Sequence, residues 1–381
     1  MLLAFRNGRI FTDAGLETGK ILLVRDGRVE SIVGASQVIG ADRVVDLRGQ
    51  MLVPGFLDTQ VNGGGGVLFN ENPDVEAIAA IGEAHRRFGT TGFLPTLISD
   101  DLHVVARAIG AVREAISKGV PGVLGIHVEG PFLAHERRGV HDGSKLRTLD
   151  AESLELLTTP HGGVTMVTLA PEKTSLENIR ALAAAGVIVS AGHTNATYEE
   201  LQPALANGLR GFTHLFNAMS QLQNREPGAV GAALNSDAWC GLIVDGHHVH
   251  AATLKIALRA KRHDRFMLVT DAMPSVGAST KSFQIQGRTI QVIPALHGDK
   301  IVDENGTLAG AHLDMVGAVR NAISLLGLDL ADALRMASAN PAAFLKLADR
   351  VGRIAPGQRA DLVLLDEQLA VQQSWIGGVA A

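Results

Sequence analysis

Cysteine is almost absent from this chain: Cys240 is the only one in 381 residues. One thiol forms no internal disulfide and supplies no sulfur-rich metal site, so His and carboxylate side chains remain as candidate metal ligands. A chain without disulfides suits a reducing compartment. We therefore expect a cytoplasmic protein.

Long apolar runs and positive charge are lacking too. No apolar run approaches the roughly 20 residues of a membrane span, and residues 1–8 show no basic region followed by an apolar one. The formal net charge of -5 disfavours nucleic acid as a partner, and an anionic substrate would need a local group of Arg and His. Aromatic residues make up 4% of the chain and hydrophobic residues 46%, which predicts a large aliphatic core with a smaller second one.

The middle of the chain alternates apolar strand patterns with amphipathic helical stretches. An eightfold alternation of this kind predicts a (β/α)8 TIM-type barrel, whose chemistry is found at the C-terminal ends of the strands. We expect its strands at residues 52–59, 92–98, 123–128, 164–169, 187–191, 211–214, 241–245 and 266–270.

Short β patterns occur at both ends of the chain, within residues 2–47 and at 360–366. The C-terminal strand is too short to bury itself alone, so we expect both ends to share one β-sandwich. The predicted domains are 1–53 and 350–381 for the sandwich and 54–349 for the barrel. Residues 284–302, after the eighth strand, predict a β-hairpin insertion.

Four strand ends carry acids or imidazoles. Glu129, His193 and His214 each close a separate predicted strand, and parallel strands in one closed sheet would bring them together as the ligands of a catalytic metal. Asp271 ends a fourth strand as a further ligand, a structural cap or a general base, and its place opposite the others favours the base. His127 lies one layer deeper than Glu129, where we expect a packed barrel residue.

Loop residues after strands three, six and seven are candidates for substrate contacts. They are His141, Asn217, Arg225 and the run Asp245-Gly-His-His-Val-His250. Exposed His and Arg on loops are usually only solvated, but these follow the active ends of barrel strands.

Several blocks of sequence together resemble one enzyme family, the N-acetylglucosamine-6-phosphate deacetylases of the amidohydrolase superfamily. The resemblance spans nearly the whole chain. Its blocks are Pro54-Gly-Phe-Leu-Asp58, His127-Val-Glu-Gly-Pro131, Gly192-His-Thr-Asn-Ala196, Thr213-His-Leu-Phe-Asn-Ala-Met219, Arg225-Glu-Pro-Gly228, Asp245-Gly-His-His248, Val269-Thr-Asp271 and Gly306-Thr-Leu-Ala-Gly310.

The resemblance implies roles for individual residues. Glu129, His193 and His214 would be the metal ligands, and Asp271 the acid/base. It also implies homodimers in which the partner chain completes the phosphate site. The implied substrate contacts are Val140 and His141, the latter near the acetyl carbonyl, Arg225 and His248 at the phosphate, and Asn217, Ala218, Leu308, Ala309 and Gly310.

The chain departs from the wider superfamily at the end of strand one, where Gln60-Val-Asn62 replaces the His-x-His of many relatives. Neutral amides are poor ligands for zinc-like ions, so we expect one divalent metal ion per chain. Gln60 and Asn62 would then hydrogen bond to the bound water or the substrate. Zinc is the metal we expect, and Fe, Mn or Co accept the same ligands.

The resemblance implies hydrolysis of N-acetylglucosamine 6-phosphate to glucosamine 6-phosphate and acetate, in amino-sugar catabolism. The alternative substrate is another N-acetyl amino-sugar phosphate, such as N-acetylgalactosamine 6-phosphate. Two His and one carboxylate also form the facial triad of iron oxygenases, against which the barrel and Asp271 count. A non-catalytic sugar-phosphate sensor would require a degraded metal site or acid, and neither is degraded.

Overall fold

The centre of the molecule is a ring of eight parallel strands, in the order β17-β16-β15-β14-β13-β12-β11-β8. The computed structural model describes residues 1–37 and 40–381. Val61 bridges Ala272 beside the two end strands, and Asn62 N donates to Ala272 O at 2.9 Å, so the ring is nearly closed. The predicted barrel is confirmed. Its strands are β8 (Phe56–Val61), β11 (Thr90–Ile98), β12 (Gly125–Glu129), β13 (Val164–Leu169), β14 (Ile188–Ala191), β15 (Leu209–Phe212), β16 (Trp239–Leu242) and β17 (Phe266–Leu268).

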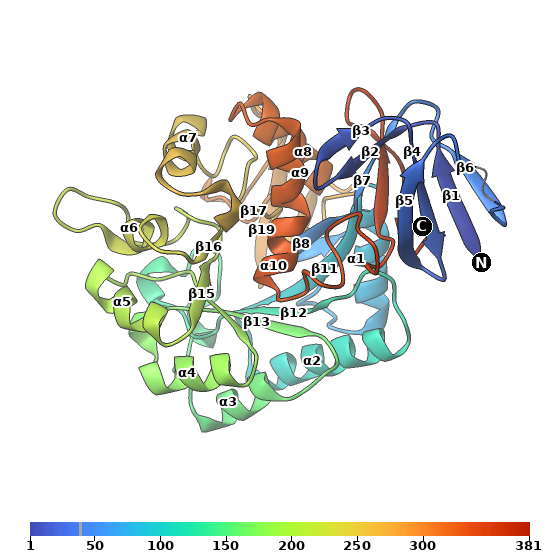
Figure 1. The fold of residues 1–381 in the computed structure, drawn as a ribbon. Helices are drawn as coiled ribbons and strands as arrows, with labels where there is room; N and C mark the ends of the chain where they lie inside the picture. The colour runs from blue at the N-terminus through green and yellow to red at the C-terminus, as the bar shows by residue number, and fades with distance from the viewer. Residues whose placement is uncertain (38–39) are drawn as a thin grey trace.

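Helices surround this ring (Figure 1). In α2, the buried residues Val105, Ala108, Ile109 and Val112 recur at spacings of three and four, so one face packs on the sheet. Side-chain caps start several helices, and at α5 Thr197 forms a capping box with Glu200. The helices are α1 (Val75–Arg86), α2 (Leu102–Ser117), α3 (Ala151–Thr158), α4 (Leu176–Ala184), α5 (Tyr198–Ala206), α6 (Gly228–Leu234), α7 (Ala251–Ala260), α8 (Met315–Ser324), α9 (Leu330–Ala337) and α10 (Ala339–Phe344). Short 3₁₀ turns are η1 (His135–Arg137), η2 (Gly143–Lys145), η3 (Pro171–Lys173) and η4 (His263–Arg265). Within the described parts of the chain, no helix is both long and apolar enough to cross a membrane.

A small β domain is built from both chain ends, as predicted. Its first sheet has the order β5-β4-β1-β6 and its second β23-β22-β21-β7-β2-β3. Antiparallel pairing of β21 with β7 joins the two ends, and the rings of Phe5 and Trp375 meet edge to face between the sheets at 5.3 Å. The strands are β1 (Leu2–Arg6), β2 (Arg9–Thr12), β3 (Gly15–Glu17), β4 (Lys20–Arg25), β5 (Arg28–Gly34), β6 (Arg43–Asp46), β7 (Met51–Pro54), β21 (Leu362–Leu365), β22 (Val371–Ile376) and β23 (Val379–Ala380).

The predicted strand at 52–59 is wrong as a single element. The chain leaves the small domain in β7 and enters the barrel in β8, with Gly55 between them. A Cβ atom at Gly55 would lie 2.0 Å from Thr91 Oγ1, so only glycine allows this close crossing. Apolar residues flank Gly55 on both sides, so periodicity alone did not separate the two strands. We propose domain boundaries of 1–53 and 350–381 for the small domain, which includes residues 38–39 outside the described parts, and 54–349 for the barrel.

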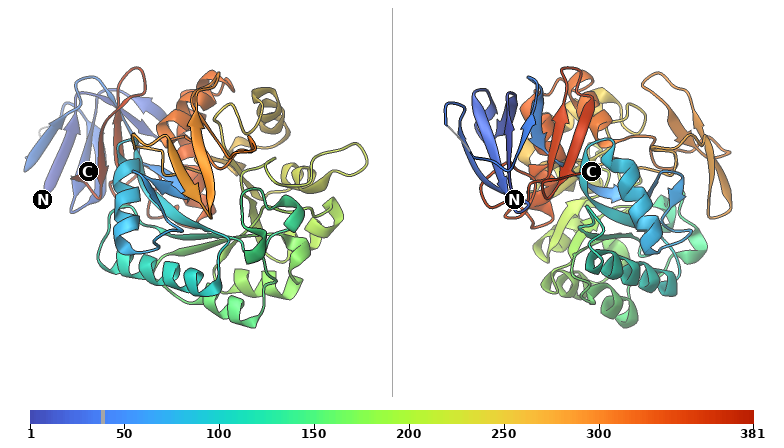
Figure 2. Two further views of the ribbon diagram at one scale, coloured as in Figure 1. Left: turned by 180° about the vertical axis from the view of Figure 1, so that it is seen from behind. Right: turned by 90° about the vertical axis from the view of Figure 1, so that its right-hand side faces the viewer.

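The insertion after the barrel has three strands where a two-stranded hairpin was predicted. They are β18 (Ser282–Ile285), β19 (Arg288–Ile293) and β20 (Lys300–Val302), in that order in the sheet. Its Ile285, Ile290 and Ile301 pack with Leu68 and Met273, beside the C-terminal ends of the barrel strands. The small domain and this sheet lie on opposite sides of the barrel (Figure 2, right). The strands β9 (Gly63–Gly64) and β10 (Val67–Leu68) pair with each other, and Leu68 of β10 packs against the β18–β20 sheet.

Candidate active site

The three predicted metal ligands meet at the C-terminal ends of barrel strands. Glu129 is the last residue of β12, and His193 and His214 each lie two residues beyond their strands, β14 and β15. Oε1 of Glu129 lies 3.2 Å from Nε2 of His193 and 3.0 Å from Nε2 of His214, and the two Nε2 atoms are 3.1 Å apart. Ligand atoms bound at about 2 Å to a tetrahedral zinc ion lie about 3.3 Å apart. The spacing therefore fits one divalent ion.

Backbone turns and hydrogen bonds orient the two imidazoles. The φ angles of His193 and His214 are 49° and 33°, in the left-handed region, where the chain turns sharply at the end of each strand. Nδ1 of His193 donates a hydrogen bond to the carbonyl oxygen of Arg137 at 2.8 Å, which leaves the Nε2 lone pair free to bind a metal. Nδ1 of His214 is buried and has no hydrogen-bond partner within the described residues.

Glu129 is held as an anion although it is buried. Burial alone would raise the pKa of its carboxyl group, but hydrogen bonds with His193 and His214 lower that pKa well below its ordinary value. Gln60 Nε2 donates to both oxygens of this carboxylate, at 3.1 and 3.2 Å. The carboxylate is thus already in the form that a metal ion requires. Burial acts to lower the pKa of His214, but its hydrogen bond with Glu129 raises that pKa above its ordinary value, so a metal ion would displace a proton from this ring as it binds.

Asp271 lies three residues beyond β17, with a φ of 52°. Burial raises the pKa of Asp271 to about 6, and the negative charge of Glu129 acts in the same direction. Asn62 Nδ2 donates to Oδ1 of Asp271 at 2.6 Å and opposes this rise. A carboxyl group with a pKa near 6 can accept and return a proton close to neutral pH.

Asp58 contributes to the site, although the sequence interpretation gave it no role. Its carboxylate accepts hydrogen bonds from Thr270 Oγ1 at 2.5 Å and from Gln60 N at 3.1 Å. Thr270 directly precedes Asp271, so Asp58 ties the ends of β8 and β17 together behind the general base. Burial raises the pKa of Asp58 to about 7. One feature of the sequence could have identified Asp58 as a site residue: it is the final residue of Pro54-Gly-Phe-Leu-Asp58, the first block that carries the family resemblance.

His141 is buried next to the cluster, with its ring centroid 4.4 Å from that of His193. The backbone N–H of Ser99 donates to Nδ1 of His141 at 3.2 Å, so the proton of the neutral ring is on Nε2. Burial lowers the pKa of His141 to about 3, and the neighbouring His193 acts in the same direction. His141 is therefore a neutral donor. Val140 before it packs on the β18–β20 sheet.

His248 is oriented by Asp245. The sequence had singled out Asp245 only as part of the loop run 245–250, a candidate for substrate contacts. Nδ1 of His248 donates to Oδ2 of Asp245 at 2.6 Å, and Oδ1 accepts the backbone N–H groups of His247 and His248. Burial acts to raise the pKa of the Asp245 carboxyl, but the hydrogen bond with His248 is among those that hold it below its ordinary value. The imidazole of His248 is thus held in one orientation.

Two further predicted segments lie against the site. Ala311 N donates to the carbonyl oxygen of Asp271 at 2.9 Å, which brings the turn of Leu308, Ala309 and Gly310 beside the acid. Asn217 Nδ2 donates to His214 O at 3.1 Å, and Ala218 O accepts from Thr194 N at 3.1 Å. Both segments therefore adjoin the residues that carry the cluster.

Arg225 is the exception among the predicted contacts. It is exposed on the loop between β15 and α6, which projects from the barrel (Figure 1). Glu226 anchors this loop by accepting the N–H groups of Tyr198 and Gly228, but the Arg225 side chain has no hydrogen bond or ion pair within residues 1–37 and 40–381. Its contact with phosphate stays a prediction.

A (β/α)8 barrel with a buried Glu/His/His cluster and a nearby acid at its strand ends is typical of metal-dependent hydrolases. A family model described as the amidohydrolase family matches residues 51–380. This chain belongs to the amidohydrolase family, and the family resemblance found in the sequence is confirmed.

Relatives of known name cover almost the whole chain. The chain is 43% identical to an N-acetylgalactosamine-6-phosphate deacetylase of Shewanella sp., over 97% of this chain and 93% of the relative. It is 33% identical to an N-acetylglucosamine-6-phosphate deacetylase of Haemophilus influenzae, over 99% of both chains. The crystal structure of N-acetylglucosamine-6-phosphate deacetylase from Pasteurella multocida is similar with a TM-score of 0.96 and 35% identity, over 100% of both chains.

Proposed function

We propose that this chain hydrolyses the N-acetyl group of N-acetylglucosamine 6-phosphate, giving glucosamine 6-phosphate and acetate, in amino-sugar catabolism. The observation that carries the proposal is the Glu129, His193 and His214 cluster with Asp271 beside it, whose pKa burial raises to about 6. The names of the relatives supply the substrate class. A divalent ion held by the cluster would lower the pKa of a bound water and polarise the amide carbonyl.

Asp271 would carry the proton through the reaction. Its carboxylate takes one proton from the attacking water, whose oxygen forms a bond to the acetyl carbon. The same proton then passes to the amide nitrogen as the C–N bond breaks. The carboxylic acid so formed gives up its remaining proton to the amine, and acetate and the ammonium form of the amino sugar leave. The hydrogen bond from Asn62 keeps Oδ1 occupied, so Oδ2 is the oxygen that moves the proton.

The remaining predicted residues would bind and orient the substrate. His141, neutral and protonated on Nε2, would donate a hydrogen bond to the acetyl oxygen as negative charge develops there. His248, fixed by Asp245, and Arg225 would bind the phosphate, with Asn217, Ala218 and the 308–310 turn around the sugar. Because Arg225 is exposed on a single chain, we propose a homodimer in which the partner chain completes the phosphate site.

The proposed metal is one zinc ion per chain, since Gln60 and Asn62 are engaged with Glu129 and Asp271. The ligand set also suits Fe, Mn or Co, and metal analysis of protein purified without chelators distinguishes these ions. We also propose a cytoplasmic location, in keeping with Cys240, which is buried and unpaired.

N-acetylgalactosamine 6-phosphate is the second candidate substrate, favoured by the relative of that activity in Shewanella. The two sugars differ only in the orientation of the C4 hydroxyl, and the acetamide chemistry is the same for both. The same residues would therefore act in either case.

The test is acetate release from each sugar phosphate by metal-loaded protein, without oxygen or 2-oxoglutarate. We expect turnover of N-acetylglucosamine 6-phosphate with one acetate for each free amine, and kcat/KM for the C4 epimer measured in parallel ranks the two substrates. Absence of acetate from both would overturn the proposal. A requirement for oxygen would favour the oxygenase alternative.

A further inference from the structure

A large cavity lies at the opposite end of the barrel from the cluster. It has a volume of about 1160 Å³, slightly above the roughly 300–1,000 Å³ of most small-molecule sites. Its walls include Leu124 just before β12, Val164 at the start of β13 and Val187 just before β14. These are the N-terminal ends of three neighbouring strands, and the other ends of β12 and β14 lead to Glu129 and His193. Strands β22 and β23 of the small domain close one side.

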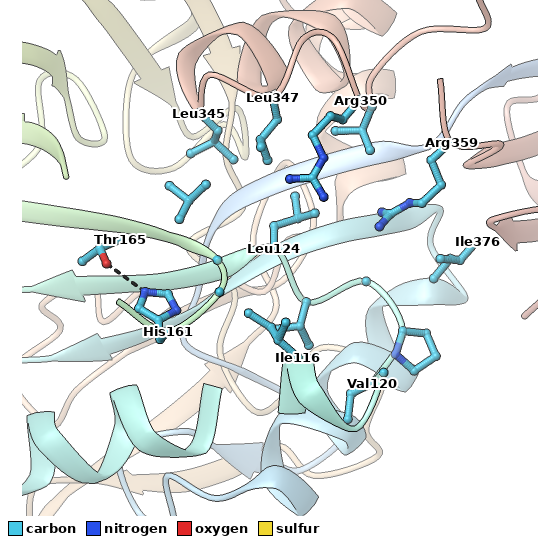
Figure 3. Close-up of a pocket in the computed structure, with 18 of the residues that line it drawn as sticks. Ile116, Val120, Leu124, His161, Thr165, Leu345, Leu347, Arg350, Arg359 and Ile376 are labelled. Carbon is cyan, nitrogen blue, oxygen red and sulfur yellow. Dashed lines mark hydrogen bonds between the residues drawn. The ribbon is translucent and has the colours of Figure 1, made fainter. Parts of the chain in front are cut away.

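Positive side chains dominate the charge of this cavity. Arg350 and Arg359 reach toward it from one side, and His161 lines the other (Figure 3). Glu83 is the only acidic side chain among the described lining residues, and the α-carboxylate of Ala381 is a second anion at the edge. The lining cations are Arg28, Arg86, Arg87, Lys346, Arg350 and Arg359.

Several of these cations lack an internal counter-charge. Asp361 neutralises Arg359 by accepting from its Nε at 2.8 Å, and Arg28 donates to Gly357 O at 2.8 Å. By contrast, the side chains of Arg87, Lys346 and Arg350 make no hydrogen bond or ion pair to any residue that the structure describes. Three cations on two separate elements, the end of α1 and the segment after α10, therefore face one cavity with their charge unpaired.

Arg86 adds a partly desolvated charge to the same wall. Its Nη1 is buried and has no hydrogen-bond partner within the described residues. Burial lowers the pKa of its guanidinium group, and the nearby Glu83 only partly offsets this. An anion in the cavity would compensate this charge without displacing a protein partner.

Much of the remaining lining is apolar, with Thr158, Thr159 and Thr165 as polar members. Ile116 and Leu124 lie near the middle of the cavity, and Leu347 and Ile376 lie beside Arg350 and Arg359 (Figure 3). The backbone of Gly162 and Gly163, in the loop before β13, also lines the cavity and presents no side chain to a ligand. A ligand that fits must therefore combine an apolar body with more than one negative group.

We propose that this cavity binds an organic phosphate of nucleotide size, with the phosphate groups on the Arg87, Lys346 and Arg350 side and the apolar body over Ile116 and Leu124. Guanidinium groups bind phosphate with two parallel hydrogen bonds, and a phosphate brings more negative charge to these cations than a single carboxylate does. The site is separate from the deacetylation centre and does not depend on the proposed function.

The experiment is calorimetric titration of the intact, metal-loaded protein with ADP, with adenosine and pyrophosphate as partial ligands. We compare the wild type with Arg350→Glu, which reverses one unpaired charge of the cavity. Arg107→Glu, on the exposed face of α2 outside the cavity, is the matched control for net charge. Arg225→Ala reports binding at the candidate active site. Thermal unfolding of each variant verifies that it folds.

We expect one ADP per chain, weaker binding of adenosine and of pyrophosphate, and a loss of at least about tenfold in ADP affinity for Arg350→Glu. Arg107→Glu and Arg225→Ala should bind ADP as the wild type does, and added salt should weaken binding. The proposal is overturned if ADP does not bind. It is equally overturned if Arg350→Glu and Arg107→Glu bind alike, or if Arg225→Ala alone abolishes binding.

Discussion

Asn62 Nδ2 donates a hydrogen bond to Oδ1 of Asp271 at 2.6 Å. The bond joins the end of the first barrel strand to the acid beyond the eighth. It is one of the influences that lower the pKa of Asp271 against the effect of burial. A neutral amide is a weak ligand for zinc-like ions, so the side chain of Asn62 is available to hydrogen bond to Asp271 and adjust its pKa.

Replacing Asp271 with Asn should leave metal binding intact and remove most of the turnover. The amide neither accepts the proton from water nor returns it to the leaving amine, and such groups typically contribute about 10²–10⁴-fold to the rate. The measurements are kcat for acetate release and metal content per chain. Near-normal kcat in a metal-loaded variant would contradict the assignment.

The pH dependence of kcat/KM should report the carboxyl group of Asp271. This group acts as a base only when ionised, so activity should fall as the pH drops through about 6, where burial places its pKa. In Asn62→Ala the bond that lowers the pKa is lost, so the pKa rises and the acid limb moves to higher pH. Asn72→Ala, at an exposed position on the loop before α1, is the control and should keep the wild-type profile. An unmoved limb in Asn62→Ala would separate Asn62 from the function of Asp271.

Metal removal should abolish activity, and one equivalent of Zn per chain should restore it. Only Glu129, His193 and His214 form a ligand cluster in the described part of the chain, while Gln60 binds Glu129 through its amide. Titration of chelator-treated protein with Zn, with activity measured at each addition, gives the stoichiometry. Activity that increases up to two tightly bound equivalents would show that the one-metal site is wrong.

Replacing Arg225 with Ala should raise KM for the 6-phosphate substrate far more than KM for unphosphorylated N-acetylglucosamine. A guanidinium group is the strongest phosphate partner among side chains, and loss of a charged hydrogen bond costs about 1.5–3 kcal/mol, or about 10–100-fold. Arg107→Ala is the matched control for loss of an exposed Arg. Equal effects on both substrates would make Arg225 a surface residue without a role in binding.

Much of the architecture was predictable because it depends on local patterns. Alternating apolar strands and amphipathic helices indicated the barrel, and β patterns at both ends indicated the small domain. The element boundaries were predicted wrongly where the apolar pattern of the sequence continues from one strand into the next. Residues 51–54 and 56–57 are apolar on both sides of Gly55, so only the pairing of β7 with β21 and of β8 with β11 shows that two domains share this run.

The candidate site likewise contains residues that the sequence predicted and residues that it missed. Strand-end positions in the sequence were enough to single out Glu129, His193, His214 and Asp271, since parallel strands in a ring bring their C-terminal ends together. Ser99 and Asp58 were missed as orienting residues because their partners, His141 and Thr270, lie 42 and 212 residues away. No local pattern reports such contacts.

The sequence by itself determined the residue types at the strand ends, the lack of sulfur ligands and the amides of strand one, and these set the class of chemistry. The tertiary structure alone decided the protonation state of each group. Burial raises the pKa of Asp271 to about 6 and lowers that of His141 to about 3, while hydrogen bonds to two imidazoles keep Glu129 ionised. The physical reason is that desolvation and charge interactions depend on distances between strands far apart in the chain, which the closed barrel sets.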